Sequence, residues 1–225
     1  MHIRQLTIFT SQLGIQRKFY AETMGLPLKN ETPDAVSFAI GKSGFTLKEK
    51  AHATPYHFAI NIPSEDEEKA LQWLKERVGV LAAQGSEIQD FSSWNAKSVY
   101  FYDPDKNIVE FIARRNLRYP PVQPFGHRSM LEVSEIGLAV DDIPPYFAQL
   151  NTQLGLERYD GNMEQFGAVG DENGLFICIN RHKKTWYPTG DKAYPSGFEL
   201  LVAHKGSEFL VSYQKGTLKI TPLHA

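Results

Sequence analysis

The feature that most constrains the fold of this chain is a strand–helix pattern that begins three times. A short apolar strand followed by an amphipathic helix starts at Gln5, again at His57 and again at Glu135. The first and third copies share their spacing, because Gly25 follows Gln5 by 20 residues and Gly155 follows Glu135 by 20 residues. A repeat of this size indicates that one copy cannot bury its own apolar face and packs against another.

Each copy also contains further strands after its helix. The predicted strands cover 36–40 and 45–49 in the first copy, 99–102 and 108–112 in the second, and 165–169, 175–180 and 198–202 in the third. Helices between strands in every copy disfavour an all-helical or strand-only protein. The predicted fold class is therefore α+β.

The copies divide the chain into two regions and a linker. Residues 1–115 contain the first two copies, and residues 131–225 contain the third. The segment 116–130 between them contains Pro120, Pro121, Pro124 and Gly126 close together, which is typical of a domain boundary.

Composition and charge exclude several classes of function. The 24 Lys+Arg and 26 Asp+Glu residues give a formal net charge of −2, so the basic excess that nucleic-acid binding needs is missing. No apolar run approaches the roughly 20 residues of a membrane-spanning helix, and no signal peptide follows Met1. The single cysteine, Cys178, excludes an intramolecular disulfide framework. We expect a cytoplasmic protein that binds a small molecule, with neither nucleic acid nor membrane as a partner.

The residues that open the three copies, Gln5, His57 and Glu135, all have side chains that can bind a metal. Glu110, in the last predicted strand of the second copy, adds a carboxylate beside His57. Side chains at strand starts are more often solvated or hydrogen-bonded than metal-bound. Spacing alone therefore leaves both interpretations open.

Three segments resemble the vicinal oxygen chelate superfamily of glyoxalases, bleomycin-resistance proteins, fosfomycin-resistance enzymes and extradiol dioxygenases. They are the opening at 5–28, the histidine strand at 56–60 and the hairpin at 101–111, of which the hairpin is the most specific. The resemblance covers residues 1–115 well and weakens over 131–204. It implies βαβββ modules, two of which pair within 1–115 into an open cup-shaped barrel around a metal. Residues 131–225 would then form a third, additional βαβββ-like module.

By position, the resemblance implies Gln5, His57 and Glu110 as the metal ligands, with Glu110, Gln5 and Tyr100 as catalytic groups. Such a set suits Mn, Fe, Ni or Zn and leaves coordination positions open for substrate oxygens. Glutamine in the first position counts against an extradiol dioxygenase, where histidine is usual. Glyoxalases use a fourth carboxylate ligand, and whether Glu49 fills that position is left open.

Strand alternation predicts which other side chains line the cup. Thr7 shares a face with Gln5, and Ser98, Tyr100 and Tyr102 share a face of the neighbouring strand. Trp94 precedes that strand and is placed at the rim. We expect Thr7, Trp94, Ser98 and Tyr102 to bind substrate, although plain sheet packing explains the tyrosines equally well.

Two functions follow from the resemblance. The first is a divalent-metal-dependent enzyme of isomerase, lyase or thiol-transferase type, acting on a small oxygen-rich metabolite or xenobiotic. The alternative is a metal-free protein that binds or sequesters a small molecule, of the bleomycin-resistance type, through Trp94, Tyr100 and Tyr102.

The odd number of modules predicts assembly. If the first two modules pair with each other, the third is left with an apolar face that includes Ile136, Leu138, Phe176 and Phe198. A soluble protein covers such a face. We therefore expect a homodimer in which the third modules of two chains pair.

Overall fold

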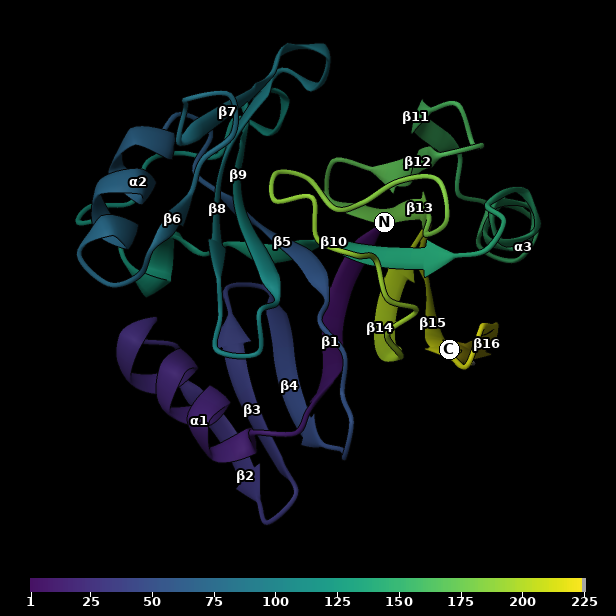
Figure 1. Ribbon diagram of the computed structural model, residues 1–225, viewed down its shortest axis with the longest axis horizontal. Coiled ribbons are helices and arrows are strands. Elements are labelled where there is room, and N and C mark those ends of the chain that lie inside the picture. Colours follow the sequence, from purple (N-terminus) through teal and green to yellow (C-terminus); the bar gives the residue numbers. More distant parts are fainter. Residues whose placement is uncertain (224–225) are drawn as a thin grey trace.

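The computed structural model describes residues 1–223, which form two mixed β-sheets packed on a shared apolar core (Figure 1). The seven-stranded sheet has the order β16-β15-β14-β1-β4-β3-β2. Its strands are β1 (His2–Thr10), β2 (Leu28–Thr32), β3 (Ala35–Ile40), β4 (Ser43–Glu49), β14 (Phe198–His204), β15 (Ser207–Gln214) and β16 (Thr217–Leu223).

The nine-stranded sheet has the order β11-β12-β13-β10-β5-β9-β8-β6, with β7 also paired to β8. Its strands are β5 (His57–Ile62), β6 (Val80–Leu81), β7 (Ile88–Phe91), β8 (Ala96–Tyr102), β9 (Ile108–Arg114), β10 (Glu132–Val140), β11 (Arg158–Gly161), β12 (Phe166–Asp171) and β13 (Gly174–Asn180). The predicted α+β class with βαβββ modules is confirmed.

Helices cover the outer sides of the sheets in Figure 1. The helical segments are α1 (Leu13–Lys18) with its π-helical continuation η1 (Phe19–Thr23), α2 (Glu67–Lys75), α3 (Pro144–Leu154), and the 3₁₀ turns η2 (Ser92–Trp94), η3 (Arg115–Leu117) and η4 (His127–Ser129). Local sequence explains their limits. The third helix starts with a proline, whose missing N–H costs nothing in the first turn, and stops at Gly155, which has a left-handed φ of 68°. None of the helices in residues 1–223 is long and apolar enough to span a bilayer.

Strand alternation fixes which side chains of β9 face away from the main core. In β9, Val109 and Phe111 belong to the main core between the sheets, whereas Ile108 and Ile112 belong to smaller apolar clusters on the other face. Glu110 lies between Val109 and Phe111 in the sequence, so its side chain points to the same face as those of Ile108 and Ile112.

The modules pair differently from the sequence-based expectation. The first module does not pair with the second; β1 pairs antiparallel with β14, and β5 pairs antiparallel with β10. The physical reason is the hairpin β15–β16, which the sequence patterns did not predict. Together with β14 it forms a partial fourth unit that completes the first module's sheet. The second module is thereby free to pair with the third.

This pairing also removes the argument for the predicted homodimer. Ile136, Leu138, Phe176 and Phe198 are all fully buried within the single chain. The segment 116–130, predicted as a linker, connects β9 to β10, which flank β5 in one sheet. The dimer stays a prediction without an uncovered face to support it.

Candidate metal centre

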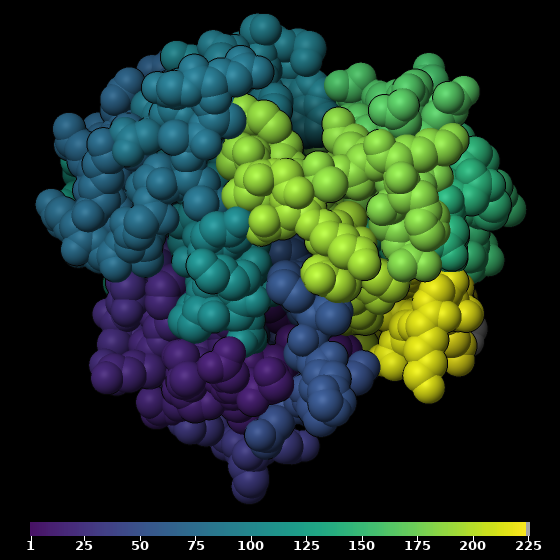
Figure 2. Space-filling model, viewed as in Figure 1, coloured from purple at the N-terminus to yellow at the C-terminus, as the bar shows by residue number. Residues whose placement is uncertain are grey.

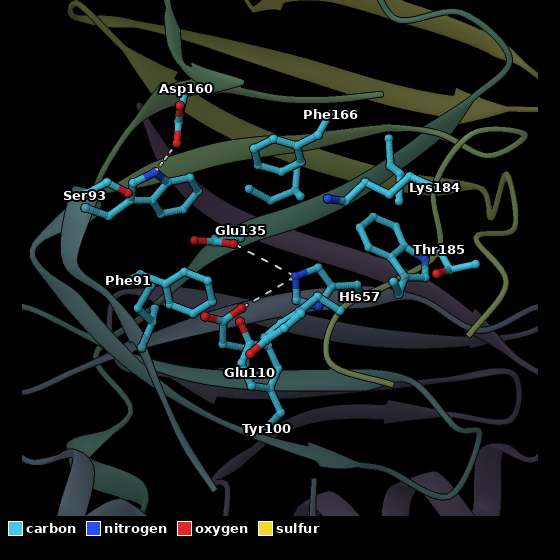
Figure 3. A pocket seen from close by; sticks show the side chains of 16 residues that line it. His57, Phe91, Ser93, Tyr100, Glu110, Glu135, Asp160, Phe166, Lys184 and Thr185 are labelled. Carbon is cyan, nitrogen blue, oxygen red and sulfur yellow. Dashed lines mark hydrogen bonds and ion pairs between the residues drawn. The ribbon is translucent and has the colours of Figure 1, made fainter. Parts of the chain in front are cut away.

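Three buried ligand-type side chains converge at the middle of the nine-stranded sheet. His57, Glu110 and Glu135 come from the adjacent strands β5, β9 and β10, and one donor atom from each lies within 4.8 Å of the others. His57 Nε2 is 3.6 Å from Glu110 Oε2 and 4.0 Å from Glu135 Oε2 (Figure 3). Each of the three residues is at most 6% exposed. We call these residues the His–Glu–Glu cluster.

The backbone orients the imidazole. His57 Nδ1 lies 3.1 Å from the carbonyl oxygen of Ile108, an acceptor, so the proton is assigned to Nδ1 and the Nε2 lone pair faces the carboxylates. Burial lowers the pKa of His57, while Glu110 and the Ile108 carbonyl oppose that shift. The neutral imidazole is the form that binds a metal.

One oxygen of each carboxylate accepts a hydrogen bond from a residue that does not line the cavity. Ser98 Oγ donates to Glu110 Oε1 at 2.5 Å, and the fully buried Arg114 donates through Nη2 to Glu135 Oε1. The Oε2 atoms of both carboxylates therefore face His57. Burial, followed by the charge of Glu110, raises the pKa of Glu135 to about 8, and Arg114 opposes the rise. Such supporting hydrogen bonds fix ligand orientation.

The second and third modules present these residues in the same register. Along β5 and β9, His57 pairs with Ile108, and Glu110 follows two residues later. Along β10 and β13, Glu135 pairs with Leu175, and Ile177 follows two residues later. An apolar side chain thus occupies the position that corresponds to Glu110. The cluster therefore has three ligand-type side chains and an apolar fourth side.

A cavity of about 260 Å³ opens over the cluster. Figure 3 shows its walls, which come from the second module, the third module and the segment between β13 and β14. In Figure 2 that yellow-green segment lies at the centre of the visible face, between the blue second module and the green third module. The lining residues are His57, Phe91, Ser93, Trp94, Tyr100, Glu110, Ile112, Glu135, Asp160, Phe166, Ile177, Ile179, Lys184, Thr185, Trp186 and Tyr187.

The structure does not bring Gln5 or Thr7 to this cavity. Both lie on β1 in the seven-stranded sheet, where Gln5 Nε2 donates to Thr46 Oγ1 at 2.8 Å. The prediction of Gln5 as a ligand and catalytic group, and of Thr7 as a substrate contact, rested on pairing of the first two modules. Glu135 holds the corresponding place beside His57. The 20-residue spacing had marked Glu135 as the equivalent of Gln5, so the signal was present in the sequence.

The remaining predicted site residues divide into two groups. Trp94 and Tyr100 line the cavity, and Ser98 lies behind it on Glu110. Tyr102 is absent from the lining and donates its hydroxyl to Asp191 Oδ2 at 2.5 Å. Glu49 ends β4 in the other sheet and is exposed, which places it away from the cluster.

Sequence reasoning missed the lining residues of the third module and of the segment that follows it. Asp160 and Phe166 come from β11 and β12, and Lys184 to Tyr187 come from irregular backbone after β13. Their position depends on the pairing of β5 with β10, which no local pattern predicts.

Comparison with known proteins supports the fold and leaves the activity open. No protein-family model and no curated protein matches the sequence. A solved structure of a candidate dioxygenase from Bacillus subtilis is similar, with 15% identity and a TM-score of 0.64 over 99% of this chain and 84% of that one. Glyoxalase I from Zea mays is also similar, with 14% identity and a TM-score of 0.57 over 98% of this chain and 92% of that one. The chain therefore has the fold of the vicinal oxygen chelate superfamily.

Proposed function

We propose that this protein is a divalent-metal-dependent enzyme acting on a small oxygen-rich molecule, and that His57, Glu110 and Glu135 hold the metal. The observation that carries the proposal is the buried nitrogen and two carboxylate oxygens at the base of an open cavity. Two ligands at 2.0–2.2 Å from a common ion lie up to about 4.4 Å apart. The separations of 3.6 and 4.0 Å from His57 Nε2 fit that limit. One imidazole and two carboxylates suit Mn, Fe, Ni or Zn.

The surrounding residues prepare the site for substrate oxygens. A bound divalent ion supplies Lewis-acid stabilisation of negative charge that develops on such oxygens. Ser98 and Arg114 hold the carboxylates in place, and Ile177 adds no fourth protein ligand. Burial, followed by the charges of Glu110 and Glu135, raises the pKa of Tyr100 well above its usual value. Tyr100 therefore keeps its proton and can donate a hydrogen bond to a substrate oxygen in the cavity. Isomerase, lyase and thiol-transferase chemistry all use these features.

Metal analysis tests the proposal directly. Protein purified without chelator is expected to contain a divalent metal, and addition of Zn²⁺, Mn²⁺ or Ni²⁺ to stripped protein should raise its melting temperature. His57→Ala and Glu135→Ala should lose both properties, whereas Gln5→Ala should retain them. Absence of bound metal together with an unchanged melting temperature contradicts the proposal. A Gln5→Ala variant that loses metal would restore the ligand set implied by the resemblance.

A metal-free binding protein is the second candidate, and the aromatic side chains in the cavity favour it. Trp94 and Tyr100 offer surfaces for stacking without any ion. Replacement of His57 by Ala separates the candidates once a ligand is in hand. Unchanged ligand affinity in His57→Ala supports sequestration, and loss of ligand affinity together with metal supports the enzyme.

A further inference from the structure

Aromatic side chains surround the space above the His–Glu–Glu cluster. They come from four separate segments of the chain: Phe91, Trp94, Tyr100, Phe166, Trp186 and Tyr187. The rings of Trp94 and Phe166 are nearly parallel, with centroids 6.5 Å apart and an angle of 27°. Trp186 lies beside the imidazole of His57, with the two ring centroids 5.1 Å apart. Figure 3 shows the labelled rings of Phe91, beside Glu110, and of Phe166, on the far side of Glu135, so aromatic side chains approach the cluster from more than one direction.

Hydrogen bonds hold these rings in place without a ligand. Trp94 Nε1 donates to Asp160 Oδ2 at 2.6 Å, and the guanidinium of Arg114 lies over the indole at 5.4 Å from its centroid. Across the cavity, the hydroxyl of Tyr187 donates to Gln89 Oε1. The slot between these rings is thus formed before a ligand binds, which reduces the entropy lost when a flat ligand enters.

One permanent cation faces this slot. Lys184 is the only lysine or arginine among the lining residues, and Figure 3 shows its amine end directed into the cavity beside Phe166. Its Nζ is 5.3 Å from the centroid of the Phe166 ring. No ion pair of Lys184 occurs within residues 1–223, whereas Asp160 is engaged by Trp94. The ammonium group is free to bind an anionic group of a ligand.

The size of the cavity suits a small ring. A cavity of about 150 Å³ is enough for benzene. The cavity of about 260 Å³ accommodates a single ring with a few small substituents.

We propose that the substrate is a planar, single-ring compound that carries an anionic group. Its ring lies between the aromatic walls, its anionic group binds Lys184, and its adjacent oxygens face His57, Glu110 and Glu135. The assignment of the oxygens rests on the proposed metal-dependent function. The assignments of the ring and of the anionic group rest on the walls and on Lys184.

Hydroxamates test the proposal, because their two adjacent oxygens bind divalent metals whatever the rest of the molecule. Isothermal titration calorimetry on zinc-loaded full-length protein compares benzohydroxamate with acetohydroxamate, which lacks the ring. We expect at least tenfold tighter binding of benzohydroxamate. The 3- and 4-carboxybenzohydroxamates are then compared with their carboxamides. At least one acid should bind at least fivefold more tightly than its amide.

Matched lysine variants assign the charge preference. Lys184→Met should abolish the advantage of the acid over the amide and leave the affinity for the amide unchanged. Lys192→Met removes an exposed lysine outside this cavity and should keep the advantage. Circular dichroism confirms that both variants are folded.

Each outcome bears on one claim. Equal affinities of benzohydroxamate and acetohydroxamate overturn the aromatic assignment, and an acid preference that is absent or survives in Lys184→Met overturns the anion assignment. The titrations are repeated after EDTA treatment and with His57→Ala. Hydroxamate affinity that does not change there contradicts the metal-dependent function, while the ring and charge ratios still decide the substrate class.

Discussion

The two sheets of this protein have equivalent strand pairings and carry different side chains at the equivalent positions. In the nine-stranded sheet, Ala59 of β5 pairs with both Glu110 and Glu135. In the seven-stranded sheet, Thr7 of β1 holds the same place and pairs with Thr46 and Glu199. The His–Glu–Glu cluster therefore has a counterpart consisting of Gln5, Thr46 and Glu199.

The counterpart differs in charge and in burial. Gln5 binds Thr46, and the ammonium of Lys48 binds Glu199 Oε2 at 2.9 Å, so a lysine supplies the positive charge there. The side chains of Lys48 and Glu199 are 43% and 40% exposed, whereas those of the buried cluster are at most 6% exposed. The comparison teaches that strand register alone does not make a metal site. Such a site also needs buried donor atoms that no cation occupies, as at Glu135, where Arg114 binds Oε1 and leaves Oε2 facing His57.

The largest expected effect concerns the charge pairs of the two sheets. Arg114→Met leaves the buried carboxylate of Glu135 without its partner, and loss of one member of a buried pair costs about 3–5 kcal/mol. Lys48→Met breaks an exposed pair, which contributes about 0–1 kcal/mol. Urea unfolding of metal-free protein at about pH 9, above the pKa of about 8 of Glu135, measures both.

A double variant checks the cause of the first effect. Adding Glu135→Gln to Arg114→Met removes the unpaired charge and should recover part of the lost stability. If the double variant is less stable than Arg114→Met, the loss does not come from the uncompensated carboxylate.

The next effect concerns metal affinity. Glu135→Ala removes one of the three proposed ligands and should weaken Zn²⁺ binding by at least about 100-fold, more than the loss of a residue that only supports a ligand. Glu199→Ala, at the corresponding place in the other sheet, should leave the affinity unchanged. Competition titration with a chromophoric chelator measures both constants. Equal losses in the two variants would contradict the assignment of the site to one sheet.

A smaller effect is expected from the serines behind the ligands. Ser98 Oγ donates to Glu110, and in the other sheet the hydroxyls of Ser37 and Thr46 lie 2.7 Å apart. Ser98→Ala should lower Zn²⁺ affinity about tenfold, since it releases an oriented carboxylate. Ser37→Ala should not change it. A Ser98→Ala variant with wild-type affinity would mean that the hydrogen bond does not orient Glu110.

The same comparison shows why part of the site was predictable. His57 and Glu110 occur in strands whose alternation and hairpin are visible in the local sequence, and the structure brings them together. Gln5 occupies an equivalent position in its own repeat, so local pattern alone cannot tell it from Glu135. What separates them is which strands pair across 71 to 78 residues of chain, as β5 does with β10.

The missed pairing has a further cause at the end of the chain. The strand β15 contains the apolar run 209–211, a strand signal that the predicted strands did not include, whereas most residues of β16 are exposed and give a weak signal. Without them the first module lacked a partner in the prediction and was assigned to the second. For the same reason, the sequence patterns did not predict that Asp160, Phe166 and Lys184 line the cavity.

The smallest effect is expected where the two sheets meet. Tyr20, which follows α1 in the first module, donates its hydroxyl to Asp103 Oδ2 at 2.8 Å in the hairpin of the second module, and both residues are buried. Asn107 Nδ2 donates to the same oxygen at 2.7 Å, so Tyr20→Phe removes only one of its donors. The free energy of unfolding should fall by about 1 kcal/mol.

The size of this loss should depend on pH. Burial raises the pKa of Asp103 to about 6 against these hydrogen bonds, so folding favours the protonated carboxyl. The contribution of Asp103 to stability therefore falls as pH rises from about 4 to 6. Losing a donor raises that pKa further, and the Tyr20→Phe deficit should therefore be smaller at pH 4 than at pH 7. Urea unfolding at the two pH values measures it, and a deficit that is larger at pH 4 would show that the hydroxyl does not stabilise the ionised carboxylate.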